Sequence, residues 1–325
     1  MSDHVVEIDG FSLAFATDNG PLPVLDAIAL AVGAGEIVGL VGESGSGKSV
    51  TATTLLRLLP KAGWSASGTI RVLGKDMLAM REPELEDFRG AKISMIFQET
   101  SNALDPLLRV GDQIAEVVRR HGRTTSREAS ARAKGLLADM QIVDVERIMR
   151  AYPFMLSGGM RQRVLIAMAF ACSPAVLVAD EPTTALDVTV QAKILRLLRD
   201  KARRSGTSVL LITHDMGIVR HLCDRVYVIH AGQIVEQGRT ADVLLSPAHP
   251  YTQALLAASP ERYASKQAIP TLRATAGPSQ RAVGCRFAPR CGLAHEACRV
   301  KPGFTPLSQT HETACWAVQE ASAHG

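Results

Sequence analysis

The stretch GESGSGKS, residues 42–49, constrains this chain more than any other. It lies between an apolar run at 37–41, typical of a strand, and TATTLLRLL at 51–59, typical of a helix. Its three glycines let backbone N–H groups curl around phosphate oxygens at the start of that helix. Lys48 would reach the β- and γ-phosphates, and Ser49 would hold Mg²⁺. The pattern predicts an α/β fold with a phosphate-binding loop.

A pair of carboxylates follows at the kind of position where a phosphate loop needs them. The apolar run AVLVAD, residues 175–180, ends in Asp180, and Glu181 comes directly after it. One carboxylate can join the Mg²⁺ shell, while the other can orient and deprotonate an attacking water. The alternative for either acid alone is a helix cap. Because the pair accompanies a phosphate loop, the sequence favours a catalytic role for these carboxylates.

Composition narrows the class of protein further. Hydrophobic residues make up 46% of the 325, which suits a chain with a buried core and argues against wholesale disorder. A net charge of +4 is too small to argue for a nucleic-acid partner, and none is expected. No apolar run reaches the length of a membrane span, and the start, MSDHVVEIDG, lacks a signal-peptide pattern. We therefore expect a protein of the cytosol that meets a membrane only through a partner.

The pattern of apolar residues predicts strands alternating with helices. Short apolar runs predict strands at 5–15, 26–32, 37–42, 175–180 and 208–213, the last two typical of buried parallel strands. Helical periodicity with charged faces predicts an inserted helical region at 110–150 and a crossover helix at 188–206. The run RVYVIHAGQIVEQG predicts a hairpin with Ala231 and Gly232 at its turn.

The order of the motifs along the chain is also informative. They run GESGSGKS, IFQET with Gln98, LSGGM, VLVADEP, TTALD and LITHD. In this order they closely resemble the ATP-binding cassette (ABC) ATPases over residues 1–245. The resemblance implies a RecA-like P-loop α/β core with an antiparallel β subdomain and an inserted α-helical subdomain at about 100–165. The expected domains are a cassette at 1–258, a linker at 259–283 and a small Cys-rich C-terminal module at 284–325.

The resemblance implies a role for each motif residue. Glu181 would be the catalytic base, His214 would sense the γ-phosphate, and Gln98 would touch Mg²⁺ and the attacking water. Ser49, Gln98 and Asp180 would hold the Mg²⁺. Taken alone, Gln98 would be an ordinary loop glutamine and His214 a structural histidine at the end of a strand. The residues expected to bind nucleotide, in this chain's site or the partner's, are Phe15, Gly42, Glu43, Ser44, Gly45, Ser46, Gly47, Lys48, Ser49, Val50, Asp180, Ser157, Gly158, Gly159 and Asp187.

Three of these positions carry a further expectation. Phe15 matches an aromatic that stacks on adenine, although it could equally be a core aromatic. Asp187 matches an aspartate that communicates between subunits, and its alternative is a helix cap. Ser157 can cap the next helix, whose first N–H groups would complete the site of a partner subunit. Met160 replaces the glutamine common across the wider family but keeps its backbone N–H, so it marks a branch rather than a defect.

Further motifs narrow the resemblance to the ATPase subunits of bacterial dipeptide and oligopeptide importers. These are HPYTQALLAASP at 249–260, the LSGGM form and the cysteine-bearing tail. The implied partners are a second ATPase subunit (as a heterodimer or a homodimer), two membrane permeases and, indirectly, a substrate-binding protein, at the cytoplasmic face of the inner membrane. Glu99 and Thr100 replace a commoner Asp-Pro, which bears on partner identity.

Three alternative functions stay open at this point. Within transport, the substrate could be a nickel chelate or another small metabolite. Outside transport, a cassette ATPase could act on nucleic acid or the ribosome, although such proteins often carry two cassettes and this chain has one phosphate loop. The third alternative is a regulatory metalloprotein that senses redox state.

Four of the six cysteines lie close to the C-terminus, at Cys285, Cys291, Cys298 and Cys315. Their gaps of five, six and sixteen residues do not match the C-x2-C pair of a zinc ribbon, whereas iron–sulfur spacings vary. The resemblance to importer ATPases implies a [4Fe–4S] cluster. The alternatives are Zn²⁺, with His295 or His311 replacing a thiol, and four unligated thiols. Cys172 and Cys223 lie in apolar stretches and are expected to be inert buried thiols.

Overall fold

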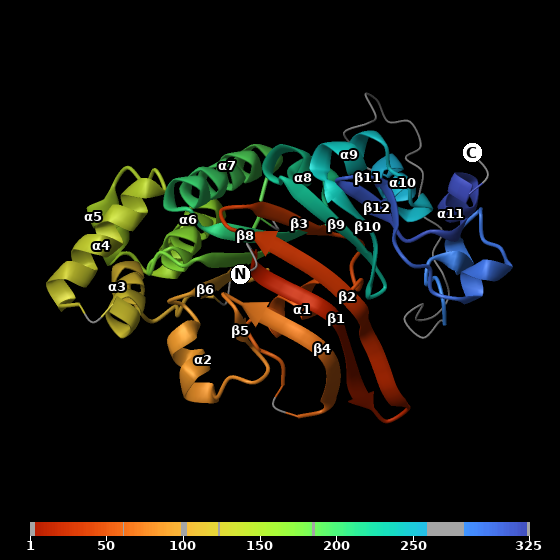
Figure 1. The fold of residues 1–325 in the computed structure, drawn as a ribbon. Helices are drawn as coiled ribbons and strands as arrows, with labels where there is room; N and C mark the ends of the chain where they lie inside the picture. Colours follow the sequence, from red (N-terminus) through yellow and green to blue (C-terminus); the bar gives the residue numbers. More distant parts are fainter. Residues whose placement is uncertain are drawn as a thin grey trace. The chain divides into compact units, whose positions relative to one another are not determined.

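The structure, a computed structural model, describes residues 4–60, 62–98, 103–122, 124–183, 186–258 and 283–323 (Figure 1). The chain divides into two compact units. Unit 1 comprises Met1–Val5, Val32–Glu36 and Val72–Leu211. Unit 2 comprises Val6–Ala31, Ile37–Arg71 and Ile212–Gly325.

The centre of unit 1 is a parallel pair of strands, β6 (Ile93–Ile96) and β7 (Val176–Asp180). Every residue of β7 is buried, as predicted from its apolar run. The predicted crossover helix is α7 (Val188–Ser205), which ends at Gly206 in the left-handed conformation that glycine favours. The chain then enters β8 (Ser208–Thr213), also buried throughout. The strands predicted at 175–180 and 208–213 are therefore confirmed.

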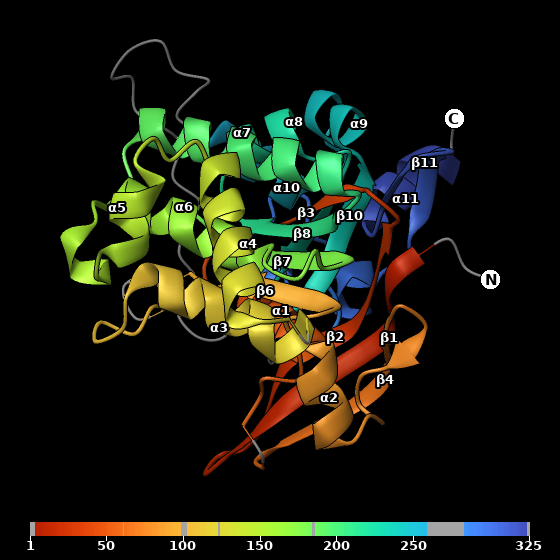
Figure 2. The ribbon, with the colours of Figure 1, turned by 90° about the vertical axis from the view of Figure 1, so that its left-hand side faces the viewer.

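The predicted helical region of unit 1 is confirmed as three helices, α3 (Val110–Gly122), α4 (Ser126–Asp139) and α5 (Val145–Arg150). A capping box in which Thr125 and Glu128 bond each other's backbone N–H groups starts α4. These helices pack against one another and, through α3 and α4, against α6 (Gly158–Ala169) (Figure 2). The remaining elements of unit 1 are β5 (Lys75–Asp76), α2 (Glu82–Phe88) and η1 (Pro153–Met155).

Unit 2 contains five neighbouring strands in the order β11-β12-β10-β9-β3. They are β3 (Ile37–Val41), β9 (Arg225–His230), β10 (Gln233–Arg239), β11 (Thr305–Ser308) and β12 (His311–Thr313). Strands β3 and β9 run parallel, whereas the pairs β9–β10, β10–β12 and β11–β12 are antiparallel. The predicted hairpin is confirmed, because Ala231 and Gly232 turn the chain with φ of +47° and +84°. The C-terminal strands thus extend the strand layer that contains β3.

A second group of strands in unit 2 lies in the order β2-β1-β4. These are β1 (His4–Thr17), β2 (Gly20–Gly33) and β4 (Trp64–Val72), and they confirm the strands predicted at 5–15 and 26–32. Over the described part of unit 2, the helices are α1 (Lys48–Leu55), α8 (Met216–Leu222), α9 (Thr240–Leu245), α10 (Pro250–Ala257), η4 (Ala288–Arg290), η5 (Glu296–Arg299) and α11 (Trp316–Ala323).

Some expectations about organisation stay predictions. The linker predicted at 259–283 lies outside the described residues except for Val283, and the replacements at Glu99 and Thr100 also lie outside them. The domain bounds of 1–258, 284–325 and about 100–165 therefore remain expectations. Among the helices of the described ranges, none combines the length and the apolar character needed to cross a membrane.

Candidate functional site

The phosphate loop, residues 42–49, connects β3 to α1 in unit 2. A Cβ on Gly42 would lie 2.1 Å from the carbonyl oxygen of Ile229, so no side chain fits there. Gly47 precedes α1 with φ of +103°, and a Cβ on it would lie 2.8 Å from a methyl carbon of Leu25. Close packing therefore requires glycine at both ends of the loop, and at Gly47 the left-handed backbone conformation requires it as well.

Lys48 is the basic residue of the loop, and its side chain is held inside it. The residue is only 5% exposed, and its Nζ donates to the carbonyl oxygens of Gly42 and Glu43, each at 2.8 Å. Ser46 Oγ lies 3.5 Å from the same nitrogen. The ammonium of Lys48 thus donates its hydrogen bonds to backbone carbonyl oxygens, and phosphate oxygens could replace these acceptors. Ser49, in the first turn of α1, is exposed.

The acidic end of β7 lies in unit 1 and brings two predicted residues together. Gln98 Nε2 donates to Glu181 Oε2 at 3.3 Å, although 83 residues separate them in sequence. Asp180, the last residue of β7, is only 4% exposed. Glu181 has φ of +43°, a left-handed conformation that is unfavourable for a non-glycine residue and is typical of strained functional positions. An amide and a carboxylate so placed can orient and deprotonate a water molecule.

Two other predicted residues of unit 1 cap helices. Ser157 Oγ accepts from the N–H of Met160 at 3.4 Å and starts α6, as the sequence predicted. Asp187 Oδ1 accepts from the N–H of Val190 at 2.9 Å and starts α7. The helix cap, which was the alternative to a role between subunits, is therefore present. Ser157 and Gly158 are exposed, which leaves the start of α6 open to an anion.

Two further predicted residues, Phe15 and His214, lie in unit 2. Phe15 is half-buried on β1, and that exposure does not decide between adenine stacking and a core position. His214 follows β8 and is exposed, which does not favour the alternative of a buried structural histidine. Their roles toward a nucleotide stay predictions.

The four cysteines of the tail gather around one small cavity in unit 2. Cys285, Cys291, Cys298 and Cys315 all line it, and its volume is about 10 Å³. Burial raises the pKa of the thiols of Cys285, Cys291 and Cys315, which favours their protonated forms. A cavity of this size has room for about one water molecule, which is too little for a four-iron cluster.

Metal binding by the tail is therefore not supported. Over the described residues, no group of three or more His, Cys, Asp or Glu side chains is placed to hold a metal ion. His311, an alternative zinc ligand, has its Nε2 within 2.7 Å of Glu236 Oε1 instead. Cys223 is buried, as predicted, whereas Cys172 is only half-buried. Burial raises the pKa of both thiols, which disfavours the reactive thiolate.

Sequence reasoning missed the residues that hold Glu43, the second residue of the phosphate loop. Arg290 donates to both carboxylate oxygens of Glu43, at 2.7 and 2.9 Å. The N–H of Glu43 donates to Tyr251 Oη at 2.8 Å. Tyr251 belongs to the HPY motif noted in the sequence, but no spacing rule connects positions 43 and 290, which are 247 residues apart.

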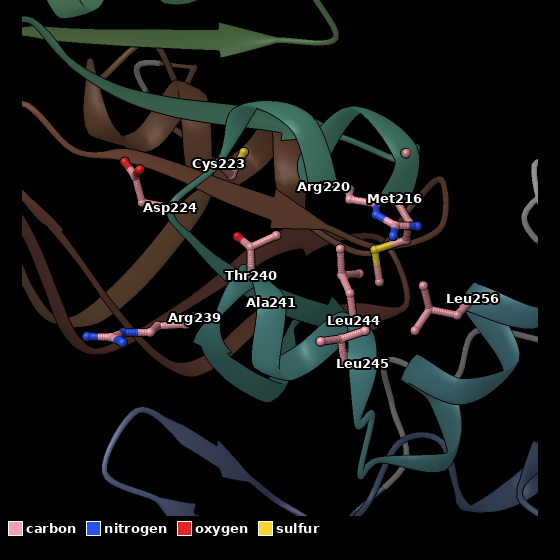
Figure 3. A pocket seen from close by; sticks show the side chains of 11 residues that line it. Met216, Arg220, Cys223, Asp224, Arg239, Thr240, Ala241, Leu244, Leu245 and Leu256 are labelled. Atoms are coloured by element: carbon pink, nitrogen blue, oxygen red, sulfur yellow. The ribbon is translucent and has the colours of Figure 1, made fainter.

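A pocket of about 600 Å³ lies elsewhere in unit 2, among α8, α9 and α10. Figure 3 shows Met216, Arg220 and three leucines gathered at one end, and Arg239 and Asp224 at the other. The predicted site residues are not among its lining residues. Pocket size alone therefore does not locate the chemistry suggested by the motifs.

The chain matches two protein families. Residues 25–184 match the family described as ABC transporter, and residues 235–298 match the family described as oligopeptide/dipeptide transporter, C-terminal region. The probable D,D-dipeptide transport ATP-binding protein DdpD of Escherichia coli (strain K12) is 48% identical over 98% of both chains. The oligopeptide transport ATP-binding protein AppD of Bacillus subtilis (strain 168) is 40% identical, again over 98% of both.

Solved structures give the same result for the fold. The dimeric structure of MJ0796, a bacterial ABC transporter cassette, is similar with a TM-score of 0.64 and 27% identity, covering 72% of this chain and 98% of that one. MJ0796 has also been solved as a dimer in a post-hydrolysis state with ADP and Pi. The structure of cbiO1 from Clostridium perfringens, part of the transporter complex cbiONQ, has a TM-score of 0.64 and 26% identity, covering 75% and 92%.

Proposed function

The chain belongs to the ATP-hydrolysing subunits of ABC transporters, and on that premise we propose that it drives uptake of di- and oligopeptides through membrane permeases. The observation that carries the proposal is similarity along the whole chain. Relatives named for dipeptide and oligopeptide transport cover 98% of it, and the oligopeptide/dipeptide C-terminal region matches at 235–298. The cassette alone would support an ABC ATPase of any substrate, whereas the C-terminal match points to peptides.

ATP binds at the phosphate loop, residues 42–49. Lys48 exchanges the carbonyl oxygens of Gly42 and Glu43 for oxygens of the β- and γ-phosphates. The hydroxyl of Ser49, the amide oxygen of Gln98 and the carboxylate of Asp180 are oxygen donors of the kind that suits Mg²⁺. When bound, this ion neutralises charge on the β- and γ-phosphates.

Hydrolysis uses the pair at the end of β7. Glu181 accepts a proton from water while the water oxygen forms its bond to the γ-phosphorus, and ADP is the leaving group. Gln98, already within hydrogen-bond distance of Glu181, orients that water. His214 contacts the γ-phosphate, and its exposed side chain is compatible with that role. Phe15 stacks on the adenine.

A second cassette completes the site. ABC cassettes work as dimers, as in the dimeric solved relative. Ser157, Gly158 and Gly159 present the start of α6, whose N–H groups and positive dipole end suit the phosphates of a partner's ATP. Asp187, at the start of α7, communicates between the subunits. We expect the second cassette to be a different chain, in an assembly fed by a substrate-binding protein.

The permeases would contact unit 1 close to Gln98. Phe97 is 46% exposed, and Leu107 and Leu108 are 82% and 50% exposed. A pocket of about 400 Å³, lined by residues of α2, β6, α3 and α6, includes Phe97. Exposed apolar side chains beside a groove are typical of a protein interface. Contact here, through the residue next to Gln98, would couple hydrolysis to a permease at the cytoplasmic face of the membrane.

The four cysteines of the tail have no part in the proposed hydrolysis. Its predicted [4Fe–4S] cluster, or Zn²⁺, is a separate question that absorbance and EPR spectra of anaerobically prepared protein would answer. Colourless, EPR-silent protein without bound zinc would leave the alternative of four unligated thiols.

Reconstitution tests the proposed function. The chain would be co-purified with the permeases and second ATPase of its assembly, placed in proteoliposomes, and supplied with the substrate-binding protein. We expect a mixture of di- and tripeptides to stimulate phosphate release and to accumulate inside the vesicles. The same complex with Glu181→Gln is the control for transport without hydrolysis. Stimulation by a nickel chelate and not by peptides would replace the peptide proposal with the alternative substrate.

A further inference from the structure

Glu43 connects the phosphate loop to the C-terminal part of unit 2 through both its backbone and its side chain. Its N–H donates to Tyr251 Oη at 2.8 Å, and its carbonyl oxygen accepts from Lys48 Nζ at the same distance. Its carboxylate accepts two hydrogen bonds from Arg290, in the fork geometry that makes arginine–carboxylate pairs specific. The peptide that holds the phosphate-binding lysine is therefore itself held by residues 251 and 290.

Arg290 is well placed to act as a fixed support. Its side chain is only 10% exposed, and its guanidinium lies 5.7 Å from the centre of the Phe287 ring. Its backbone N–H donates to the carbonyl oxygen of Phe287 within the short helix η4. The pair with Glu43 is thus partly desolvated, where a charged hydrogen bond is stronger than at an exposed surface.

The charges of Glu43 and Arg290 connect this contact to nucleotide binding. The Arg290 hydrogen bonds hold the pKa of the Glu43 carboxyl below its usual range, so this residue stays ionised at neutral pH. An ionised carboxylate in a loop that binds a triphosphate would repel its ligand unless a cation balanced it. Arg290 supplies that balance from a part of the chain outside the cassette motifs.

We propose that Arg290 is a positioning residue for nucleoside triphosphate binding, which neutralises Glu43 and holds its peptide against Lys48. The inference rests on the proposed function, because it assumes that ATP binds at the phosphate loop. It makes the Cys-rich tail a structural component of the ATP site. ATP affinity then depends on a contact between residues 43 and 290, while the chemistry at Glu181 does not.

Binding and turnover of ATP by the full chain test this role. Arg290→Met keeps an apolar side chain against Phe287 but removes the charge, and we expect the Kd and KM for ATP to rise about tenfold, with kcat changed less than about twofold. Arg290→Lys, which keeps the charge without the fork, should fall between this variant and the wild type. The matched control is Arg299→Met in the same tail, because Arg299 is 82% exposed and pairs only loosely with Glu296.

A double variant separates the neutralisation of Glu43 from general support of the fold. Glu43→Gln combined with Arg290→Met removes both charges, so ATP affinity should recover toward that of the wild type. A loss caused only by a loosened tail would persist in the double variant, and that result would overturn the proposal. So would wild-type affinity in Arg290→Met. If Arg290→Met fails to fold by circular dichroism, the comparison of Arg290→Lys with the double variant decides. Failure of the wild type to bind ATP would refute the proposed function instead.

Discussion

The phosphate loop of unit 2 and the acidic end of β7 in unit 1 are built in contrasting ways. In the loop, Lys48 is buried and donates hydrogen bonds to two carbonyl oxygens, and Glu43 is held by Arg290 and Tyr251. At the end of β7, Glu181 has a strained backbone, and its contact with the exposed Gln98 is a longer hydrogen bond of 3.3 Å. The first arrangement suits a binding site formed in advance. The second suits groups that adjust when nucleotide and a partner subunit arrive.

Replacing Glu181 with Gln should break this comparison most strongly. The amide keeps the size of the side chain but cannot accept the proton from water, so kcat should fall roughly 10²–10⁴-fold while ATP affinity is retained. Phosphate release and equilibrium nucleotide binding measure the two quantities separately. Glu146→Gln is a suitable control, because Glu146 is an exposed acid on α5 of the same unit. Rapid phosphate release by Glu181→Gln would exclude this residue as the base.

Mild acid should lower the stability of the protein around the phosphate loop. His230 and His249 lie among the rings of Tyr251 and Phe287. Burial lowers the pKa of each to about 4, and the charge of Arg290 adds to the effect on His230. The unfolded value is roughly 6.5, so the native state disfavours the protonated form. The contribution of the two neutral histidines to the free energy of unfolding is therefore fully present above about pH 6.5. It falls as pH drops toward 4, by on the order of 3 kcal/mol for each histidine.

Urea unfolding at several pH values between 7.5 and 4 would measure this loss. His249→Asn is the informative variant, because asparagine can still cap α10 as His249 does but does not titrate in this range. Its stability should depend less on pH than that of the wild type. An identical pH dependence in the two proteins would show that His249 does not contribute.

The sequence predicted local features of both regions well, for a physical reason. Gly42, Lys48, Asp180 and Glu181 belong to short motifs whose backbone context is set by adjacent strands and helices. Apolar periodicity therefore located β3, β7 and α7, and motif order supplied Gln98. The contact of Gln98 with Glu181 could be expected only from resemblance, because its partners are 83 residues apart.

The C-terminal tail shows where such reasoning stops. The resemblance to importer ATPases implied a cluster at its four cysteines, yet the described thiols surround a cavity of about 10 Å³ and form no metal-binding group. Its contribution to the loop, through Arg290, depends on where the fold places η4, 247 residues along the chain from Glu43. Long-range pairing of this kind leaves no local pattern, and an arginine five residues after Cys285 is unremarkable in sequence.

The smallest expected effect concerns Met160, which lies in the first turn of α6. Its contribution there is a backbone N–H, which donates to Ser157 Oγ at 3.4 Å and is independent of the side chain. Methionine and glutamine have similar length and helix propensity, so Met160→Gln should leave both ATP affinity and kcat within about twofold of the wild type. Ser157→Ala is the informative comparison, since it removes the cap and should cost about 1 kcal/mol of stability. A large change in ATPase rate for Met160→Gln alone would mean that the side chain, and not only the backbone, faces the partner's nucleotide.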